Sequence, residues 1–235
     1  MSESVFRFKQ FTVHQDRCAM KVGTDAVLLG SWVKTCDAKK ILDIGTGTGI
    51  IAMMLAQKSS ADIDAIDIDM KACLQAQENV RESAWAGRIR IHNISFQEFS
   101  TTGNQYDLIV SNPPYFSDAP KPSTIERIQS RHTDLLPFNE LISGVKKVIT
   151  PLGKFCVVLP CPEGKKLMDI ALRNGLFTNK ILRVKTVHDK EKRTILELSQ
   201  EMKPIVEEEI TIQNSEHTFS KEYAELTSEF YLAAK

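Results

Sequence analysis

Short apolar runs along the chain alternate with longer segments whose apolar residues recur at helical spacing. This alternation predicts an α/β fold, in which a mostly parallel sheet is flanked by helices. We expect seven strands in the sheet, at residues 40–44, 62–68, 88–94, 106–111, 154–159, 177–187 and 192–199. The last two strands, joined by residues 188–191, predict an antiparallel C-terminal hairpin.

Helical patterns fill the intervals between the strands and also occur near both ends of the chain. We expect helices at residues 24–32, 49–58, 70–83, 138–149, 163–173 and 220–231. Thr24 or Asp25 suits the N-cap of the first helix, because a side-chain oxygen there can accept a backbone N–H bond. Residues 112–136 form a connection that is longer than usual, which predicts that this stretch is functional or mobile.

The formal charges sum to zero, but they are distributed unevenly along the chain. Residues 1–119 hold 12 basic and 14 acidic side chains, residues 120–193 hold 15 and 7, and residues 194–235 hold 3 and 9. The middle third therefore has a net charge of +8, as a surface that tracks phosphates would have. A charge run alone is also typical of an ordinary solvated surface.

Neither a membrane segment nor a secretion signal is expected. No stretch approaches the roughly 20 apolar residues that cross a bilayer, and the N-terminus lacks the apolar region of a signal peptide. The five cysteines form no CxxC pair and no histidine cluster accompanies them, which predicts reduced thiols and no metal site. We therefore expect a cytoplasmic protein without a membrane partner.

A glycine-rich turn follows the first predicted strand. In the segment LDIGTGTGI, Gly45, Gly47 and Gly49 stand where glycine permits a tight turn and lets a ligand approach the backbone. Proteins that bind NAD, FAD or S-adenosyl-L-methionine all use such a turn. The dinucleotide fingerprint would need glycine at position 50, where Ile50 stands. The GxGxG spacing after Asp43 instead resembles the first motif of class I methyltransferases, whose cofactor is S-adenosyl-L-methionine.

The resemblance to class I methyltransferases implies further cofactor contacts. Asp43 would pair with the methionine ammonium, and Asp67, at the end of the second strand, would accept the ribose hydroxyls. The third strand of these enzymes commonly ends in an Asp that meets the adenine amino group. This sequence has Ser95 there, which can still form a hydrogen bond, followed by Phe96, which can pack on the adenine ring.

The fourth strand runs into Asn112, Pro113, Pro114 and Tyr115, at the edge of the sheet where α/β proteins bind ligands. An exocyclic amino nitrogen on adenine, or an amide nitrogen on glutamine, is a poor nucleophile because its lone pair is delocalised. The Asn112 side-chain oxygen and the Pro113 carbonyl can each accept a hydrogen bond from that nitrogen and turn its lone pair towards the methyl group. Tyr115 offers a face on which a flat base stacks. We predict Asn112, Pro113 and Tyr115 as catalytic residues, with Asn112 also beside the cofactor.

The NPPY motif alone does not choose the methyl acceptor, since DNA adenine-N6, release-factor glutamine and RNA methylases have similar motifs. Residues 6–32, FRFKQFTVHQDRCAMKVGTDAVLLGSW, resemble the N-terminus of the bacterial tRNA1(Val) adenine-N6 methyltransferases, as do the tail SKEYAELTSEFYL and the SRHT at residues 130–133. The resemblance covers nearly the entire chain. It implies a Rossmann-like class I fold, S-adenosyl-L-methionine as cofactor, and N6-methylation of adenosine 37 in the anticodon stem-loop of tRNA1(Val).

No repeat or Pro/Gly/Ser linker divides the chain, so residues 1–235 are expected to form a single methyltransferase domain. Residues 1–38 would be an N-terminal extension, residues 39–200 the catalytic core, and residues 201–235 a C-terminal strand and helix. By resemblance, Thr24 lies in a block near the methionine end of the cofactor, although simple helix capping explains it almost as well.

A tRNA substrate needs cations for its phosphates and a pocket into which the target base is splayed. We expect such contacts from basic residues in the loop after NPPY and around the hairpin. They are Arg127, Arg131, His132, Lys185, Lys190, Lys192 and Arg193. An ordinary surface role is an alternative for each cation, and a structural role is an alternative for His132.

Three other functions are compatible with the motifs. A protein glutamine methylase would use the same NPPY chemistry, but such enzymes usually have a helical N-terminal recognition domain, for which we expect no room before the core. An rRNA or DNA methylase is the second alternative, and DNA is not the expected partner because no target-recognition domain fits. A non-catalytic nucleotide- or RNA-binding module is the third, although a pure binder has no need for Asn112.

Overall fold

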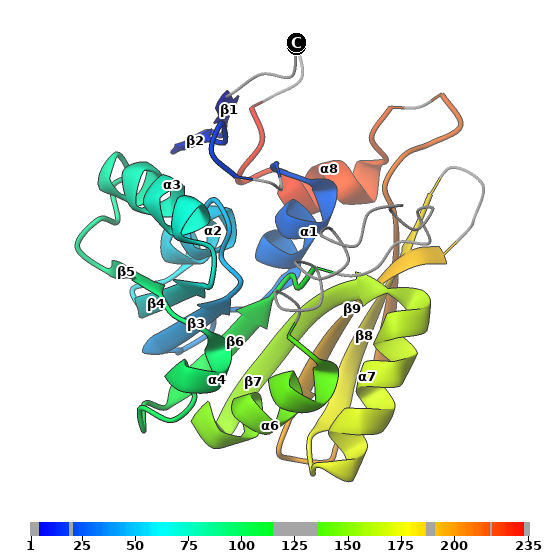
Figure 1. Ribbon diagram of the computed structural model, residues 1–235. Coiled ribbons are helices and arrows are strands. Elements are labelled where there is room, and N and C mark those ends of the chain that lie inside the picture. Colours follow the sequence, from blue (N-terminus) through cyan, green and yellow to red (C-terminus); the bar gives the residue numbers. More distant parts are fainter. Residues whose placement is uncertain (1–4, 19–20, 115–135, 187–190, 217, 233–235) are drawn as a thin grey trace, which may run out of the picture.

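A computed structural model describes residues 5–18, 21–114, 136–186, 191–216 and 218–232. Within these residues one large sheet is formed by β3 (Lys40–Ile44), β4 (Asp62–Asp67), β5 (Ile89–Asn93), β6 (Tyr106–Ser111), β7 (Ile149–Pro160), β8 (Phe177–Lys185), β9 (Glu191–Ser199) and β10 (Val206–Thr211). The spatial order is β10-β8-β9-β7-β6-β3-β4-β5 (Figure 1). Strand β9 is antiparallel to both of its neighbours, and the other neighbouring strands are parallel. The α/β class and the antiparallel hairpin of β8 and β9 are confirmed.

The expected number of seven strands is wrong, because β10 joins the described sheet as an eighth strand, parallel to β8 at the edge. Its sequence VEEEIT has three consecutive glutamates, which strands disfavour, so the pattern alone did not place it in the sheet. Backbone pairing with β8 places it in the sheet, and two cross-strand ion pairs accompany this pairing. The Glu207 carboxylate lies 2.9 Å from the Arg183 guanidinium, and the Glu209 carboxylate lies 2.7 Å from Lys185 Nζ.

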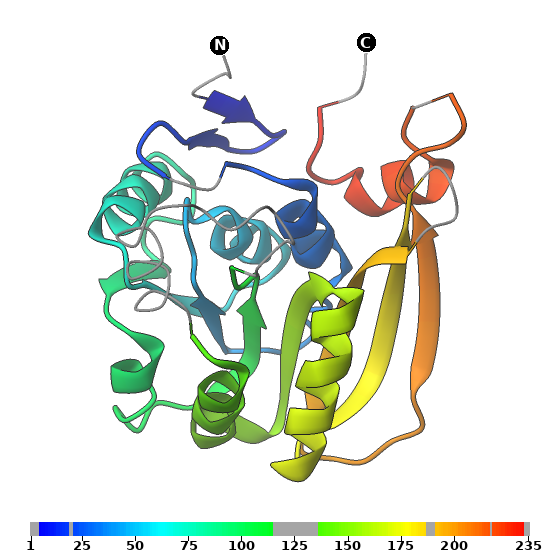
Figure 2. The ribbon, with the colours of Figure 1, turned by 45° about the vertical axis from the view of Figure 1, so that its right-hand side comes forward.

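Helices cover both faces of the sheet (Figures 1 and 2). The described helices are α1 (Thr24–Trp32), α2 (Ile50–Lys58), α3 (Met70–Arg81), α4 (Phe96–Phe99), α6 (Phe138–Val148), α7 (Cys161–Arg173) and α8 (Lys221–Thr227). Helices α1, α2 and α8 contribute to one buried apolar cluster, and α4, α6 and α7 contribute to a second cluster on the opposite face. This two-sided cover explains why the parallel strands are apolar on both faces.

The N-cap prediction for α1 is wrong, because Gly23 occupies that position and makes no side-chain cap bond. Asp25 is instead bonded to Arg193 through a 2.8 Å contact between Oδ2 and Nε. Helix α8 ends at Thr227, earlier than expected, because the chain turns there and buries Phe230 in the core. The short antiparallel strands β1 (Val5–Arg7) and β2 (Thr12–His14) were not predicted.

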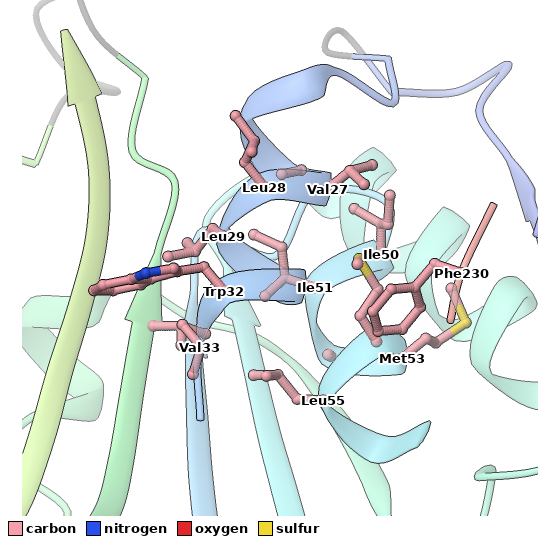
Figure 3. Packing of buried hydrophobic residues seen from close by; sticks show 14 of the residues in the cluster. Val27, Leu28, Leu29, Trp32, Val33, Ile50, Ile51, Met53, Leu55 and Phe230 are labelled. Carbon is pink, nitrogen blue, oxygen red and sulfur yellow. The ribbon is translucent and has the colours of Figure 1, made fainter. Parts of the chain in front are cut away.

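Helices α1 and α2 pack against each other, with a glycine of α1 at the contact. A Cβ added to Gly30 would lie 2.6 Å from Met54 Sδ, so a larger residue would require the Met54 side chain to move. Around this contact, Val27, Leu28 and Leu29 of α1 pack with Ile50 and other apolar side chains of α2 (Figure 3). The two helices pack in the same buried cluster as side chains of β3 and β4.

Replacing Lys58 by methionine should lower the free energy of unfolding by about 1–3 kcal/mol. Lys58 Nζ donates to the carbonyl oxygens of Gly30 (3.0 Å), Ser31 (2.8 Å) and Val33 (2.6 Å), at the C-terminal end of α1. Methionine keeps the length of the side chain but leaves these carbonyls without the donor. Urea denaturation measures the effect, and the exposed Lys166→Met on α7 is the control, for which a change within about 0.5 kcal/mol is expected. An equal loss in both variants would contradict the capping role.

Among the described helices, none combines the length and apolar character needed to cross a membrane.

Candidate active site

The glycine-rich turn between β3 and α2 has the backbone geometry that its sequence predicts. Gly45, Gly47 and Gly49 have φ values of +73°, +56° and +82°, in the left-handed region that favours glycine. The backbone N–H groups of Gly45 and Thr46 both donate to the Ile66 carbonyl, each at 2.9 Å, and this anchors the turn to β4. A Cβ added to Gly45 or Gly47 would meet no described atom within 4 Å, so the backbone here faces open space.

The open space is a cavity of about 250 Å³ at the carboxyl ends of β3, β4 and β6. It is bounded by the glycine-rich turn, the end of β4, the start of α4 and the residues after β6. The predicted site residues that line it are Gly45, Gly47, Asp67, Ser95, Phe96, Asn112 and Pro113. Thr24, Asp43 and Gly49, also predicted, are not among the residues that line it. The cavity therefore brings most of the glycine-rich motif and of the NPPY motif together at the carboxyl ends of the strands. Thr24 lies apart from them, exposed at the start of α1.

Asp43 lies behind the cavity wall and is fully buried. Its Oδ2 accepts a hydrogen bond of 2.7 Å from Thr46 Oγ1, while its Oδ1 has no hydrogen-bond partner among the described residues. Burial raises the pKa of Asp43 to about 7, and the negative charge of nearby Asp67 also raises it. A buried carboxyl in this state is stabilised in its ionised form by a positive charge placed beside it.

Asp67 lines the cavity at the end of β4. Its Oδ2 accepts a 2.9 Å hydrogen bond from the Gly47 N–H, and its Oδ1 accepts one of 2.9 Å from the Asp69 N–H. Burial raises its pKa as well. Asp69, rather than Asp67, is the N-cap of α3, where its side chain accepts from the Lys71 N–H. The carboxylate of Asp67 is therefore tied to the glycine-rich turn and faces the cavity.

Ser95 and Phe96 reach the cavity, but both also have structural contacts. Ser95 is the N-cap of α4, where its Oγ accepts from the Glu98 N–H at 3.2 Å and donates to Glu98 Oε2 at 2.8 Å. The Phe96 side chain is buried in the second apolar cluster, in contact with Gly144 of α6. Only part of each side chain is available to a ligand.

Asn112, directly after β6, lines the cavity and has a buried amide oxygen. Asn112 Oδ1 is buried and has no hydrogen-bond partner among the described residues, and Pro113 beside it is buried. Ser111 Oγ donates to the Ile44 carbonyl at 2.9 Å, which ties the end of β6 to β3. A buried acceptor without a donor costs free energy, so it is an expected feature of a site that receives an N–H group. Tyr115 lies outside the described residues.

The remaining predictions concern the tips of the hairpin. Lys185 Nζ lies 2.7 Å from Glu209 Oε1, Arg193 is paired with Asp25, and Lys192 is exposed. All three lie at the same end of the sheet as the cavity, since Arg193 is opposite Pro160 at the carboxyl end of β7. Arg127, Arg131, His132 and Lys190 lie outside the described residues.

Cys18 and Lys21 also line the cavity, and neither was predicted as a site residue. They come from the N-terminal extension, before α1 begins. Burial, together with Asp67 and Asp69, raises the pKa of Cys18 to about 11, so this thiol is a weak nucleophile at neutral pH. The resemblance placed the nearby Thr24 close to the cofactor, but no local motif singled out Cys18 or Lys21.

Comparisons with known proteins identify the class and family of the chain. The Methyltransferase small domain family matches residues 18–159, so the protein is a methyltransferase of that class. The chain is 45% identical over 237 residues to a tRNA1(Val) (adenine(37)-N6)-methyltransferase of Trichodesmium erythraeum, and 44% identical over 237 residues to one of Parabacteroides distasonis, with 99% of every chain covered. It belongs to the tRNA1(Val) (adenine(37)-N6)-methyltransferase family.

The fold is also similar to that of solved structures. A predicted O-methyltransferase of Agrobacterium tumefaciens superimposes with a TM-score of 0.67 at 14% identity, covering 90% of this chain and 99% of that one. At this identity the likeness concerns the fold alone, which is the Rossmann-like methyltransferase fold.

Proposed function

We propose that the protein transfers a methyl group from S-adenosyl-L-methionine to the N6 amino group of adenosine 37 in tRNA1(Val). The observation that carries the proposal is the unpartnered Oδ1 of Asn112, which lies in the wall of a cavity that the glycine-rich turn also bounds. The names of the relatives, at 45% and 44% identity over nearly their full length, support the acceptor.

The residues around the cavity fit the methyl donor. Gly45 and Gly47 leave room for a ligand against the backbone, and the Asp67 carboxylate can accept bonds from ribose hydroxyls. Asp43 lies directly behind, where its ionised form would favour a cationic ligand. S-adenosyl-L-methionine supplies a methyl group on a positively charged sulfur. These residues would hold it, and Asp43 would do so through its charge because it does not line the cavity.

Asn112 and Pro113 would hold the acceptor. The side-chain oxygen of Asn112 and the carbonyl oxygen of Pro113 would each accept a hydrogen bond from the adenine NH2. These two bonds would turn the N–H groups out of the ring plane, so that the nitrogen lone pair points towards the donor. Proline has no N–H and fixes the turn, so its carbonyl keeps one direction. No strong base is needed, because the proton leaves after the methyl group has arrived. Positioning supplies most of the acceleration.

The anticodon stem-loop is the part of the tRNA that we propose to bind beside the cavity. Lys192 is the exposed described cation at the hairpin tip, and Arg193 and Lys185 lie beside it in ion pairs. In a loop, the target base is splayed out at a lower cost than in a duplex, so a cavity at the sheet edge can receive it.

A methyl-transfer assay tests the proposal. Purified protein is incubated with tritiated S-adenosyl-L-methionine and, separately, a tRNA1(Val) transcript, a release factor and adenine-containing DNA. We expect label in the tRNA only, and mass spectrometry of the digested tRNA should show N6-methyladenosine from position 37. Label in the release factor would support the glutamine methylase instead, and an A37 variant of the tRNA that is still labelled would contradict the proposed position.

Donor binding should strengthen by up to about tenfold between about pH 6 and pH 8. Since burial raises the pKa of Asp43 to about 7, this carboxyl is partly protonated near neutrality. A cationic donor favours the ionised form, so binding expels a proton and becomes tighter as pH rises. Isothermal titration calorimetry with S-adenosyl-L-methionine measures the profile. Asp43→Asn should flatten it, and an unchanged slope in that variant would assign the titration to another group.

A further inference from the structure

Two amide side chains of α3 are buried outside the lining of the cavity. Gln75 and Asn79 are 0% and 1% exposed, and they stand four residues apart, so they share one face of the helix. Ala76 lies between them on the same side and contacts Gly49, where an added Cβ would lie 3.4 Å from the Ala76 Cβ. This face of α3 is therefore packed directly against the glycine-rich turn.

Asn79 uses its amide to join two distant segments. Its Oδ1 accepts from the His14 N–H at 2.8 Å, and its Nδ2 donates to the His14 carbonyl at 2.9 Å, as a neighbouring strand would. The same Nδ2 donates to the Thr48 carbonyl of the glycine-rich turn at 2.9 Å. One buried side chain thus holds the end of β2 and the turn at a fixed separation.

Gln75 continues the attachment one helical turn earlier. Its Oε1 accepts from the Arg17 N–H at 3.1 Å, so the backbone is held at a second point, three residues after His14. Within the same segment, Gln15 Oε1 accepts a hydrogen bond of 2.8 Å from the Val22 N–H, which ties residue 15 to residue 22. The segment so held includes Cys18 and Lys21, both of which line the cavity.

We infer that Asn79, assisted by Gln75, is a positioning residue of the donor site, which holds the N-terminal segment against the glycine-rich turn and so completes the cavity wall. The inference rests on the proposed function, because it assigns this wall to S-adenosyl-L-methionine. Asn79 does not line the cavity and acts through the backbone of His14 and Thr48. The amide is used in both directions, as acceptor and donor, so an isosteric apolar side chain removes all three bonds at once.

Asn79→Leu should raise the dissociation constant of S-adenosylhomocysteine by about tenfold in calorimetry. The KM for S-adenosyl-L-methionine should rise by a similar factor, while kcat at saturating donor stays within about threefold of the wild-type value. Hydrogen exchange of the backbone amides of His14 and Arg17 should accelerate, because both N–H groups lose or loosen their side-chain acceptors. This split between KM and kcat would not follow from a general loss of stability.

Asn179→Leu is the matched control. Asn179 is also a buried amide, with its Nδ2 bonded to Ser199 Oγ at 2.6 Å, but it lies near the start of β8, at the opposite end of the sheet from the cavity. We expect its donor affinity to stay within about twofold of wild type. Gln75→Leu removes a single backbone bond and should raise the dissociation constant by about threefold, which provides a second test if Asn79→Leu does not fold.

The outcomes separate the two proposals. If the wild-type protein does not bind S-adenosylhomocysteine, the donor assignment fails and this inference fails with it. If the wild type binds and both Asn79→Leu and Gln75→Leu retain its affinity, the positioning role alone is overturned. An equal loss of affinity in Asn179→Leu would also overturn it, since the effect would then follow from stability.

Discussion

Asn112→Ala should lower kcat for methyl transfer to tRNA1(Val) by about 10²–10³-fold. The variant removes the Oδ1 that has no described partner at the end of β6, and with it one of the two acceptors proposed to hold the adenine amine. The remaining Pro113 carbonyl cannot by itself direct the lone pair. The measurement is single-turnover transfer of tritiated methyl groups at saturating donor and tRNA.

The same variant should bind S-adenosylhomocysteine within about threefold of the wild-type affinity, because most of the proposed donor contacts come from β3 and β4. Asn174→Ala is the control for protein preparation, because Asn174 is exposed at the end of α7. This variant should retain full turnover. Wild-type turnover in Asn112→Ala would overturn the proposed mechanism. A parallel loss of donor binding and turnover would instead place Asn112 mainly in the donor site.

Asp67→Ala should weaken S-adenosylhomocysteine binding by about 100-fold. Each hydrogen bond from a ribose hydroxyl to a carboxylate contributes about 1.5–3 kcal/mol, and the variant also frees the Gly47 N–H that the carboxylate holds at 2.9 Å. Both effects act on the donor site, so the variant should lose donor affinity more than it loses turnover. Calorimetry gives the dissociation constant directly.

Asp62→Ala is the control for this prediction. Asp62 is an exposed aspartate at the other end of the same strand, so its loss removes a charge from β4 without touching the cavity. We expect affinity within about twofold of wild type. An Asp67→Ala variant with unchanged affinity would exclude the carboxylate as a ribose contact.

Much of the core could be predicted because its signals are local. The bounds of β3, β6 and α1 agree with the predicted ranges 40–44, 106–111 and 24–32. In each case the apolar pattern ends near a glycine, a proline or a charged residue. These residues influence the conformation of their own backbone, so their effect is local. The strand β10 was missing from the predicted sheet, because its glutamates pair with Arg183 and Lys185 on another strand, which no local pattern indicates.

The candidate site divides in the same way. Gly45, Gly47, Asp67 and Asn112 were predicted from motifs that follow strands, and parallel strands bring such motifs to one edge. For the N-terminal extension, the resemblance placed Thr24 near the donor, whereas Cys18 and Lys21 line the cavity; no local motif indicates that these two side chains reach it.

The sequence by itself determined most strands and helices of the core, where the glycine turn bends and which amide follows β6, since these depend on backbone preferences within a few residues. Only the tertiary structure decided which polar groups are buried and with what they pair. Arg193 meets Asp25 across 168 positions, and Asn79 meets His14 across 65. Such pairs depend on the distance between packed elements and on the water excluded between them, and a linear pattern contains neither quantity.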